Sequence, residues 1–153
     1  MIKRRNFLAL AAVLGPLASV SARAAVGLPA VEVFKNPYCS CCEAWVSHLK
    51  AAGFAVKVNL VEDTAPVRRR AGIPERLGSC HTALVAGYAL EGHVPAADVK
   101  RLLAERPDAA GLAVPGMPVG APGMEAGARK DPFDVLLVDR RGQATVFASH
   151  NKA

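Results

Sequence analysis

The sequence predicts an α/β domain in which helices flank a small mixed central sheet. The β-branched run Val31–Phe34 is followed by a helical repeat of apolar residues and then by the alternating run 56–60, which is the pattern of a β-α-β unit. Further along, two short apolar runs flank Ala86-Gly87, and this spacing predicts an antiparallel hairpin. Because a helix-linked pair is parallel and a hairpin is antiparallel, the sheet must be mixed.

Within the β-α-β unit, the predicted helix has one apolar face, and Gly53 is placed to end it. The two strands should run parallel with a right-handed crossover. A short helix is predicted after Thr64, with Pro66 in its first turn and its end near Gly72. The apolar face of the first helix comprises Cys42, Trp45, Val46, Leu49 and Ala52.

The second half of the chain continues with strands at 82–85 and 88–91 and a helix from Pro95 to about Glu105. The stretch Gly111–Glu125 is rich in proline and glycine, so we expect neither a regular helix nor a central strand there. Its apolar content predicts an ordered loop packed on the domain. Two apolar runs around residues 140–142 then predict a last hairpin.

This order of elements matches a thioredoxin-like domain, in which the thiols lie at the N-terminus of the first helix. In that fold, a loop before the third strand approaches the thiol turn. The residues at the equivalent place here are Cys80 and His81. We therefore expect Cys80 to lie beside the cysteines of the first helix, namely Cys39, Cys41 and Cys42.

The N-terminus predicts an export signal over residues 1–24 that is removed. A basic start precedes an apolar stretch too short to span a membrane comfortably, and Ala22-Arg23-Ala24 fits a cleavage site. Arg4-Arg5 also resembles a twin-arginine signal. Residues 25–153 would then form one periplasmic domain with no membrane segment.

Removal of the signal also changes the charge of the protein. The full chain carries a net charge of +6, but the signal holds 4 of its 19 basic residues and none of its 13 acidic residues. The remaining balance of 15 basic against 13 acidic residues gives +2. This small excess gives no support to nucleic-acid binding, and we expect no nucleic-acid partner.

The cysteines are arranged for chemistry rather than for cross-linking. Three of the four fall in one C-x-C-C turn, and a disulfide within such a turn closes too little chain to stabilise the fold much. A helix N-terminus favours thiolate, which attacks disulfides and binds soft metals. A structural disulfide site without metal remains the weakest of the alternatives.

Several motifs together resemble one bacterial periplasmic family. They are C-x-C-C-x-x-W, S-C-H-T-A, E-G-H-V-P-A and the proline- and glycine-rich stretch ending in P-G-M-E. The family was long catalogued as a domain of unknown function and includes the CopG-type copper-resistance proteins. The resemblance covers residues 31–147. It implies a thioredoxin-like fold, a role in copper resistance or homeostasis, and copper bound by the cysteines, in some members as a multi-copper cluster. The implied ligands are Cys39, Cys41, Cys42 and Cys80.

Thiolates in this pattern suit Cu(I) better than Zn(II). Cu(I) is soft and accepts few ligands, whereas a tetrahedral zinc ion would strain a turn in which two cysteines are adjacent. His81, Met117 and Met124 are further candidate ligands, since imidazole and thioether sulfur also bind copper. Copper export or chaperone proteins of the periplasm are the expected partners.

An enzyme is the alternative, so enzymatic activity stays open. Cys39 and Cys42 form a C-x-x-C pair and could serve as nucleophile and resolving thiol of a thiol–disulfide oxidoreductase. A copper-coupled redox reaction at the same two thiols would combine both functions.

Other residues have simpler interpretations. For His93 we favour capping or packing at a helix start over a metal role. We expect His48 to be solvated, and Tyr38 could shield the thiols. The run 68–70 should form a solvated basic face, and a docking patch for an acidic partner is the alternative.

Overall fold

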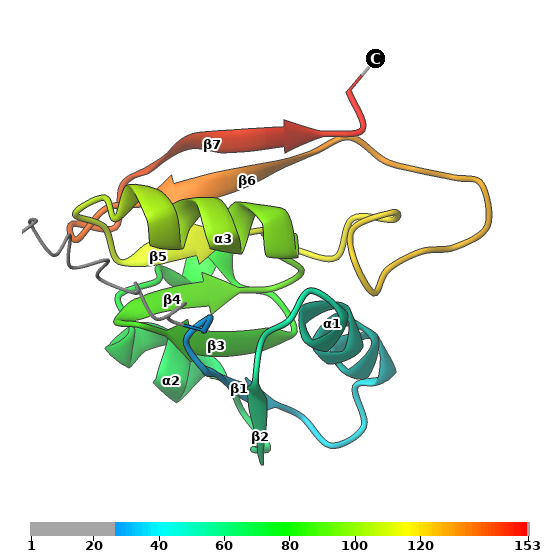
Figure 1. Cartoon of the computed structure of the whole chain (residues 1–153), viewed down its shortest axis with the longest axis horizontal. Helices are drawn as coiled ribbons and strands as arrows, with labels where there is room; N and C mark the ends of the chain where they lie inside the picture. Colours follow the sequence, from blue (N-terminus) through cyan, green and yellow to red (C-terminus); the bar gives the residue numbers. More distant parts are fainter. Residues whose placement is uncertain (1–26, 153) are drawn as a thin grey trace, which may run out of the picture.

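The computed structural model describes residues 27–152, so the predicted export signal lies outside the described residues. The chain forms a mixed α/β fold around one sheet of seven strands in the order β2-β1-β3-β4-β5-β6-β7 (Figure 1). The mixed sheet is confirmed. It is larger than expected, because the C-terminal hairpin extends the central sheet. Within residues 27–152, no helix combines the length and apolar character needed to cross a membrane.

The first three elements form the predicted β-α-β unit. They are β1 (Val31–Lys35), α1 (Ser40–Ala51) and β2 (Val56–Leu60), and the two strands are parallel. The apolar face predicted for α1 is buried at Cys42, Trp45, Val46 and Leu49. Gly53 follows the helix with φ of +96°, a conformation that glycine adopts without a steric penalty.

The next elements are α2 (Ala65–Arg70), the 3₁₀ helix η1 (Glu75–Leu77), and the strands β3 (His81–Val85) and β4 (Tyr88–Glu91). Strands β3 and β4 form the predicted hairpin, and both turn residues, Ala86 and Gly87, have positive φ. Strand β3 also pairs antiparallel with β1. This pairing places the start of β3 beside the end of β1, where the thiol turn begins.

The chain then forms α3 (Ala96–Glu105), β5 (Gly111–Ala113), β6 (Phe133–Val138) and β7 (Ala144–His150). The expectation that 111–125 holds no central strand was wrong at its first three residues. Strand β5 pairs with both β4 and β6. Gly111 permits this close approach, because a Cβ there would lie 1.9 Å from the Ala89 carbonyl oxygen.

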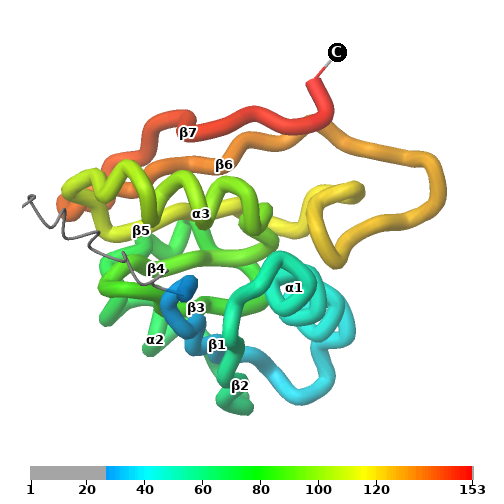
Figure 2. The backbone as a smooth tube through the Cα atoms, in the orientation of Figure 1, coloured from blue at the N-terminus to red at the C-terminus, as the bar shows by residue number. Residues whose placement is uncertain are grey.

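Hydrophobic side chains fill both faces of the sheet. On one face, Trp45 and Leu49 of α1 and Leu102 of α3 pack against alternate strand residues, and on the other face Ile73 and Leu77 do so. Figure 1 shows α1 and α3 on one side of the strands and α2 on the other. The tube in Figure 2 shows the loop after β5, in yellow, passing the start of α1 before the chain returns to β6.

Candidate metal centre

The first three cysteines lie where β1 gives way to α1. Asn36 shapes the turn, because its side-chain oxygen accepts a hydrogen bond from Tyr38 N at 2.9 Å and its carbonyl oxygen accepts one from Cys39 N at 3.2 Å. Cys39 is the N-cap residue of α1, so the cysteines occupy the helix start. Unpaired amides and the helix dipole make this a favourable place for thiolates.

The fourth cysteine arrives from a separate segment through the β1–β3 pairing. In this ladder Lys35 lies opposite His81, so Cys80, one residue earlier, faces the turn that follows β1. The Cys80 sulfur lies 4.0 Å from the Cys41 sulfur, which in turn lies 3.2 Å from the Cys39 sulfur. The predicted approach of Cys80 to the C-x-C-C turn is therefore confirmed.

All four sulfurs lie within 4.8 Å of one another. Cys42 is fully buried, whereas Cys39, Cys41 and Cys80 are partly exposed. Cys39 and Cys42 are paired as a disulfide, and Cys41 and Cys80 are free. Because a disulfide sulfur is not a thiolate, only the reduced chain offers four thiolates to a metal.

Two buried histidines extend the thiol cluster. Cys80 Sγ lies 3.3 Å from His81 Nδ1 and 3.1 Å from His93 Nε2, so these three residues form a second group able to hold a metal ion. His81 was predicted as a candidate ligand. For His93, capping or packing was favoured over a metal role, but the structure brings its ring to the cluster.

The tautomer of His93 follows from its other contact. Its Nδ1 lies 2.8 Å from the Pro122 carbonyl oxygen, which can only accept a hydrogen bond. In the neutral ring the proton is therefore on Nδ1, and the lone pair of Nε2 faces the Cys80 thiol. A carbonyl partner of this kind commonly orients a metal-binding histidine.

Burial favours the uncharged forms of Cys80, His81 and His93. Burial, reinforced by the Cys41 charge, raises the pKa of Cys80 to about 12. Burial and the neighbouring His93 lower the pKa of His81 to about 3, and burial also lowers the pKa of His93. The Nε2 atom of His81 is buried and has no hydrogen-bond partner among the described residues. The other ring nitrogen, Nδ1, is the one beside the Cys80 sulfur, and a neutral imidazole next to soft sulfur donors fits a site for a soft metal ion.

The proline- and glycine-rich loop closes over the start of α1. A Cβ on Gly123 would lie 2.7 Å from Trp45 N and 2.9 Å from the Cys41 carbonyl oxygen, so the loop backbone rests directly on the helix. Met124 packs against the core, and Met117 is 54% exposed. The ordered, packed loop is confirmed, while a ligand role for either methionine stays a prediction.

Three expectations about the surroundings were wrong. Tyr38 is 93% exposed and does not shield the thiols. His48 is half-buried, and its Nε2 accepts a hydrogen bond from Ala96 N at 3.0 Å at the start of α3. The third was wrong only at Arg68, which is buried and pairs with the buried Glu91, while Arg69 and Arg70 are exposed as expected. Trp45 is a core residue as predicted, and its indole N–H donates to the Val94 carbonyl at 2.8 Å.

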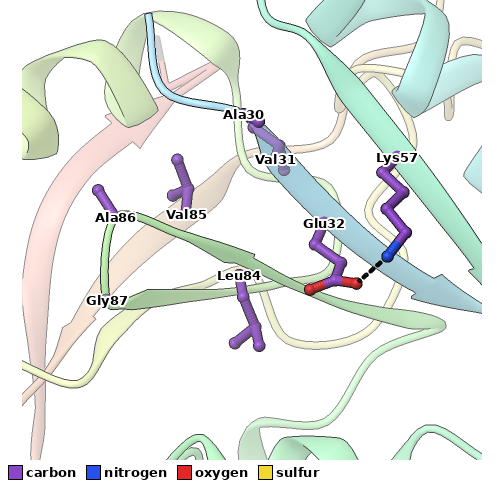
Figure 3. A pocket seen from close by; sticks show the side chains of 8 residues that line it. All are labelled: Ala30, Val31, Glu32, Lys57, Leu84, Val85, Ala86 and Gly87. Carbon is purple, nitrogen blue, oxygen red and sulfur yellow. Dashed lines mark hydrogen bonds and ion pairs between the residues drawn. The ribbon is translucent and has the colours of Figure 1, made fainter.

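A surface pocket of about 290 Å³ lies away from the cysteines (Figure 3). It is lined by Val31 at the start of β1 and by Val85 at the end of β3, whereas the thiols follow β1 and precede β3. Its charged groups, Glu32 and Lys57, are bonded to each other at 3.0 Å. No cysteine or histidine lines this pocket, and the cluster of four cysteines with His81 and His93 lies at the opposite end of these strands.

The fold and the site together define a small α/β protein with a thiol and imidazole cluster able to hold metal. A family model described as "Protein of unknown function, DUF411" matches residues 77–124. Two solved structures of "Copper resistance protein copG", Form 2 and Form 1, are similar to this chain with a TM-score of 0.77 each. Their identities are 47% and 46%, over 80% and 82% of this chain and 98% and 99% of theirs. No curated protein matches the chain significantly.

The chain belongs to the family of the CopG copper-resistance proteins, as its motifs predicted. Sequence reasoning underrated His93 at the site, because its local context, Gly-His-Val-Pro before a helix, is equally typical of a capping residue. The available signal was the second histidine following the Cys80 segment, but only the fold shows that both rings meet one sulfur.

Proposed function

We propose that this protein binds Cu(I) through Cys39, Cys41, Cys42 and Cys80 and thereby contributes to copper resistance or homeostasis. The observation that carries the proposal is the approach of Cys80 to the C-x-C-C turn, which gathers four sulfurs within 4.8 Å. Four soft donors at such spacing can bridge more than one Cu(I) ion. The copper-resistance relatives support the same metal.

The surroundings of the cluster favour Cu(I) over a hard ion. The neighbouring nitrogens belong to His81 and His93, whose lowered pKa values keep both rings neutral and available as metal ligands. Bound Cu(I) would compensate the thiolate charges in a partly buried site. Met117 and Met124 could add thioether donors if the loop shifts toward the cluster.

The location of the protein is part of the proposal. Residues 1–24 would direct export to the periplasm and be removed, and copper export or chaperone proteins there would deliver or receive the ion. We further propose that the first half of the fold is thioredoxin-like. The strand order β2-β1-β3-β4, with thiols at the start of α1, supports this assignment.

Anaerobic titration of the reduced protein with Cu(I), in competition with a chromophoric chelator, tests the copper proposal. We expect more than one Cu(I) per chain. Cys80→Ser should lower the stoichiometry or weaken binding at least tenfold, while Ser40→Ala, a change in the same turn without a thiol, should leave binding unaltered. Unchanged binding by Cys80→Ser would contradict the shared four-sulfur site.

The second candidate is a thiol–disulfide oxidoreductase, and one observation favours it. Cys39 and Cys42 are paired as a disulfide, with Cys39 partly exposed and Cys42 buried, as expected of an attacking and a resolving thiol. In a copper-coupled version, the two thiols would give two electrons to two Cu(II) ions, yielding one disulfide, two Cu(I) ions and two protons. Disulfide reductase activity that is lost in Cys39→Ser but retained in Cys41→Ser and Cys80→Ser, with weak copper binding, would favour this enzyme.

A further inference from the structure

A buried ion pair between Arg68 and Glu91 contacts Ser79, the residue before Cys80. Arg68 Nε donates to Glu91 Oε1 at 2.8 Å, and the two side chains are only 7% and 0% exposed. Burying two charges is costly unless their remaining donors and acceptors are also used. Here some of these remaining donors and acceptors bond the backbone next to Cys80, which connects the ion pair to the thiol site.

The pair holds both backbone polar groups of Ser79, the residue before Cys80. Arg68 Nη2 donates to the Ser79 carbonyl oxygen at 3.1 Å, and Ser79 N donates to Glu91 Oε1 at 2.7 Å. The pair is itself fixed by further bonds. Arg68 also donates to Thr64 Oγ1 at 3.2 Å and to Glu75 Oε1 at 3.0 Å, and Thr82 Oγ1 donates to Glu91 Oε2 at 2.6 Å.

Two neighbouring residues depend on the same arrangement. Gly78 leaves room for the guanidinium, because a Cβ there would be 2.8 Å from Arg68 Nη1. The Ser79 hydroxyl donates to the Gly116 carbonyl oxygen at 2.5 Å, and its oxygen lies 3.9 Å from Cys80 Sγ. The pair therefore orders the residue that joins the Cys80 segment to the loop after β5.

Cys80 needs such support because it lies outside the strand ladder. The paired residues of β3 begin at His81, so the β-sheet alone leaves the Ser79–Cys80 backbone without ladder bonds. A site built from separate segments binds metal tightly only if its donors are held in place beforehand. Ser79 is hydrogen-bonded through both its N–H and its C=O, and these bonds fix the backbone next to Cys80.

We propose that Arg68 and Glu91 are positioning residues that hold Cys80 at the three-cysteine turn. The expected effect of this ion pair on Cu(I) binding rests on the proposed function, whereas its expected effect on the distance between the Cys41 and Cys80 sulfurs does not. Arg68 would thus affect metal binding through Ser79, the residue next to Cys80. From the sequence alone, Arg68 was expected to be the first member of an exposed basic run.

The first experiment measures the distance effect without copper. In a Cys39→Ser/Cys42→Ser background, Cys41 and Cys80 are the two remaining thiols, and phenylarsine oxide binds tightly only when both sulfurs can reach one arsenic atom. Arg68→Gln should weaken phenylarsine oxide binding at least tenfold, while the exposed neighbour changed in Arg69→Gln should leave it within twofold. Equal binding by both variants would overturn the proposal.

The second experiment separates positioning from general destabilisation. In the four-cysteine protein, Arg68→Gln should weaken Cu(I) binding at least tenfold, but in a Cys80→Ser background it should have no further effect. Equal weakening in both backgrounds would show a purely structural role and overturn the proposal. If the protein binds no copper at all, the proposed function fails, and the arsenic result alone decides the positioning role.

A milder change keeps the test decisive if Arg68→Gln does not fold. Gly78→Ala retains both charges and has an ordinary φ of −62°, yet its methyl group would displace the guanidinium. It should weaken phenylarsine oxide binding at least threefold, and Glu91→Gln should act in the same direction. Folded Gly78→Ala protein that binds the probe as tightly as the parent would overturn the proposal.

Discussion

Replacing Gly123 with alanine should detach the loop after β5 from the start of α1. Gly123 has φ of +84°, and an added Cβ would lie 2.7 Å from Trp45 N and 2.9 Å from the Cys41 carbonyl oxygen. Both atoms belong to helix backbone, which cannot move aside cheaply. The left-handed conformation costs a non-glycine residue about 1–2 kcal/mol. Relieving the overlap should add about 1–3 kcal/mol. We expect a total loss of about 2–5 kcal/mol.

Gly87→Ala provides a matched control for backbone strain. Gly87 has nearly the same φ, +87°, but a Cβ there meets nothing within 4 Å. Gly87→Ala should therefore lower the free energy of unfolding only by the cost of the left-handed conformation, about 1–2 kcal/mol. Urea denaturation of the reduced protein, followed by circular dichroism, measures both free energies of unfolding. A difference below about 0.5 kcal/mol between the two variants would refute the close packing of the loop on α1.

The same substitution should also affect the candidate metal centre. Pro122, which precedes Gly123, accepts the hydrogen bond from His93 Nδ1 at 2.8 Å. Displacing the loop should release the His93 ring from its orientation toward Cys80. Gly123→Ala should therefore weaken Cu(I) binding in the chelator competition, whereas Gly87→Ala should not, and equal affinities would contradict the link between loop and imidazole.

Three further predictions follow from buried groups. Burial lowers the pKa of His81 from the ordinary 6.5 to about 3, so as the pH drops the unfolded chain binds a proton at this ring before the folded chain does. The free energy of unfolding should therefore fall by about 1.4 kcal/mol per pH unit as the pH drops below 6.5. Urea denaturation midpoints measured over this pH range should show a smaller slope in His81→Gln. Because burial raises the pKa of Cys80 to about 12, Cu(I) must displace its proton, so copper affinity should decrease as the pH is lowered, and a pH-independent affinity in competition assays would speak against thiolate ligation by Cys80. Trp45→Phe leaves the Val94 carbonyl without its indole partner and should cost about 1–3 kcal/mol in urea denaturation, and a loss below 0.5 kcal/mol would show that this bond is dispensable.

Local signals predicted much of the fold. The apolar repeat of α1, the glycine after it and the turn residues of both hairpins act over a few neighbours, so each can be interpreted from a short window. Strand β5 was missed for the opposite reason. Gly111–Ala113 has no strand pattern of its own and is a strand only because β4 and β6 pair with it on both sides.

The thiol site was predictable where motif and topology agreed. The likeness of the element order to a thioredoxin-like domain, in which the loop before the third strand approaches the thiols, was the basis for expecting Cys80 beside the C-x-C-C turn. The site roles of His93 and Arg68 were not predictable, because a histidine before a helix usually caps or packs and an arginine in a basic run usually faces solvent. Their burial depends on which residues stand opposite in space, namely Cys80 for His93 and Glu91 for Arg68.

The antiparallel register of β1 and β3 has a consequence for engineering. Because Lys35 lies opposite His81, the C-x-C-C turn after β1 and Cys80 before β3 meet at one site, although they are far apart in sequence. A short peptide that copies the C-x-C-C turn would lack the fourth sulfur and both imidazoles. Anyone who wishes to graft this centre into another scaffold must therefore transplant a pair of adjacent strands with their alignment intact, rather than a linear motif.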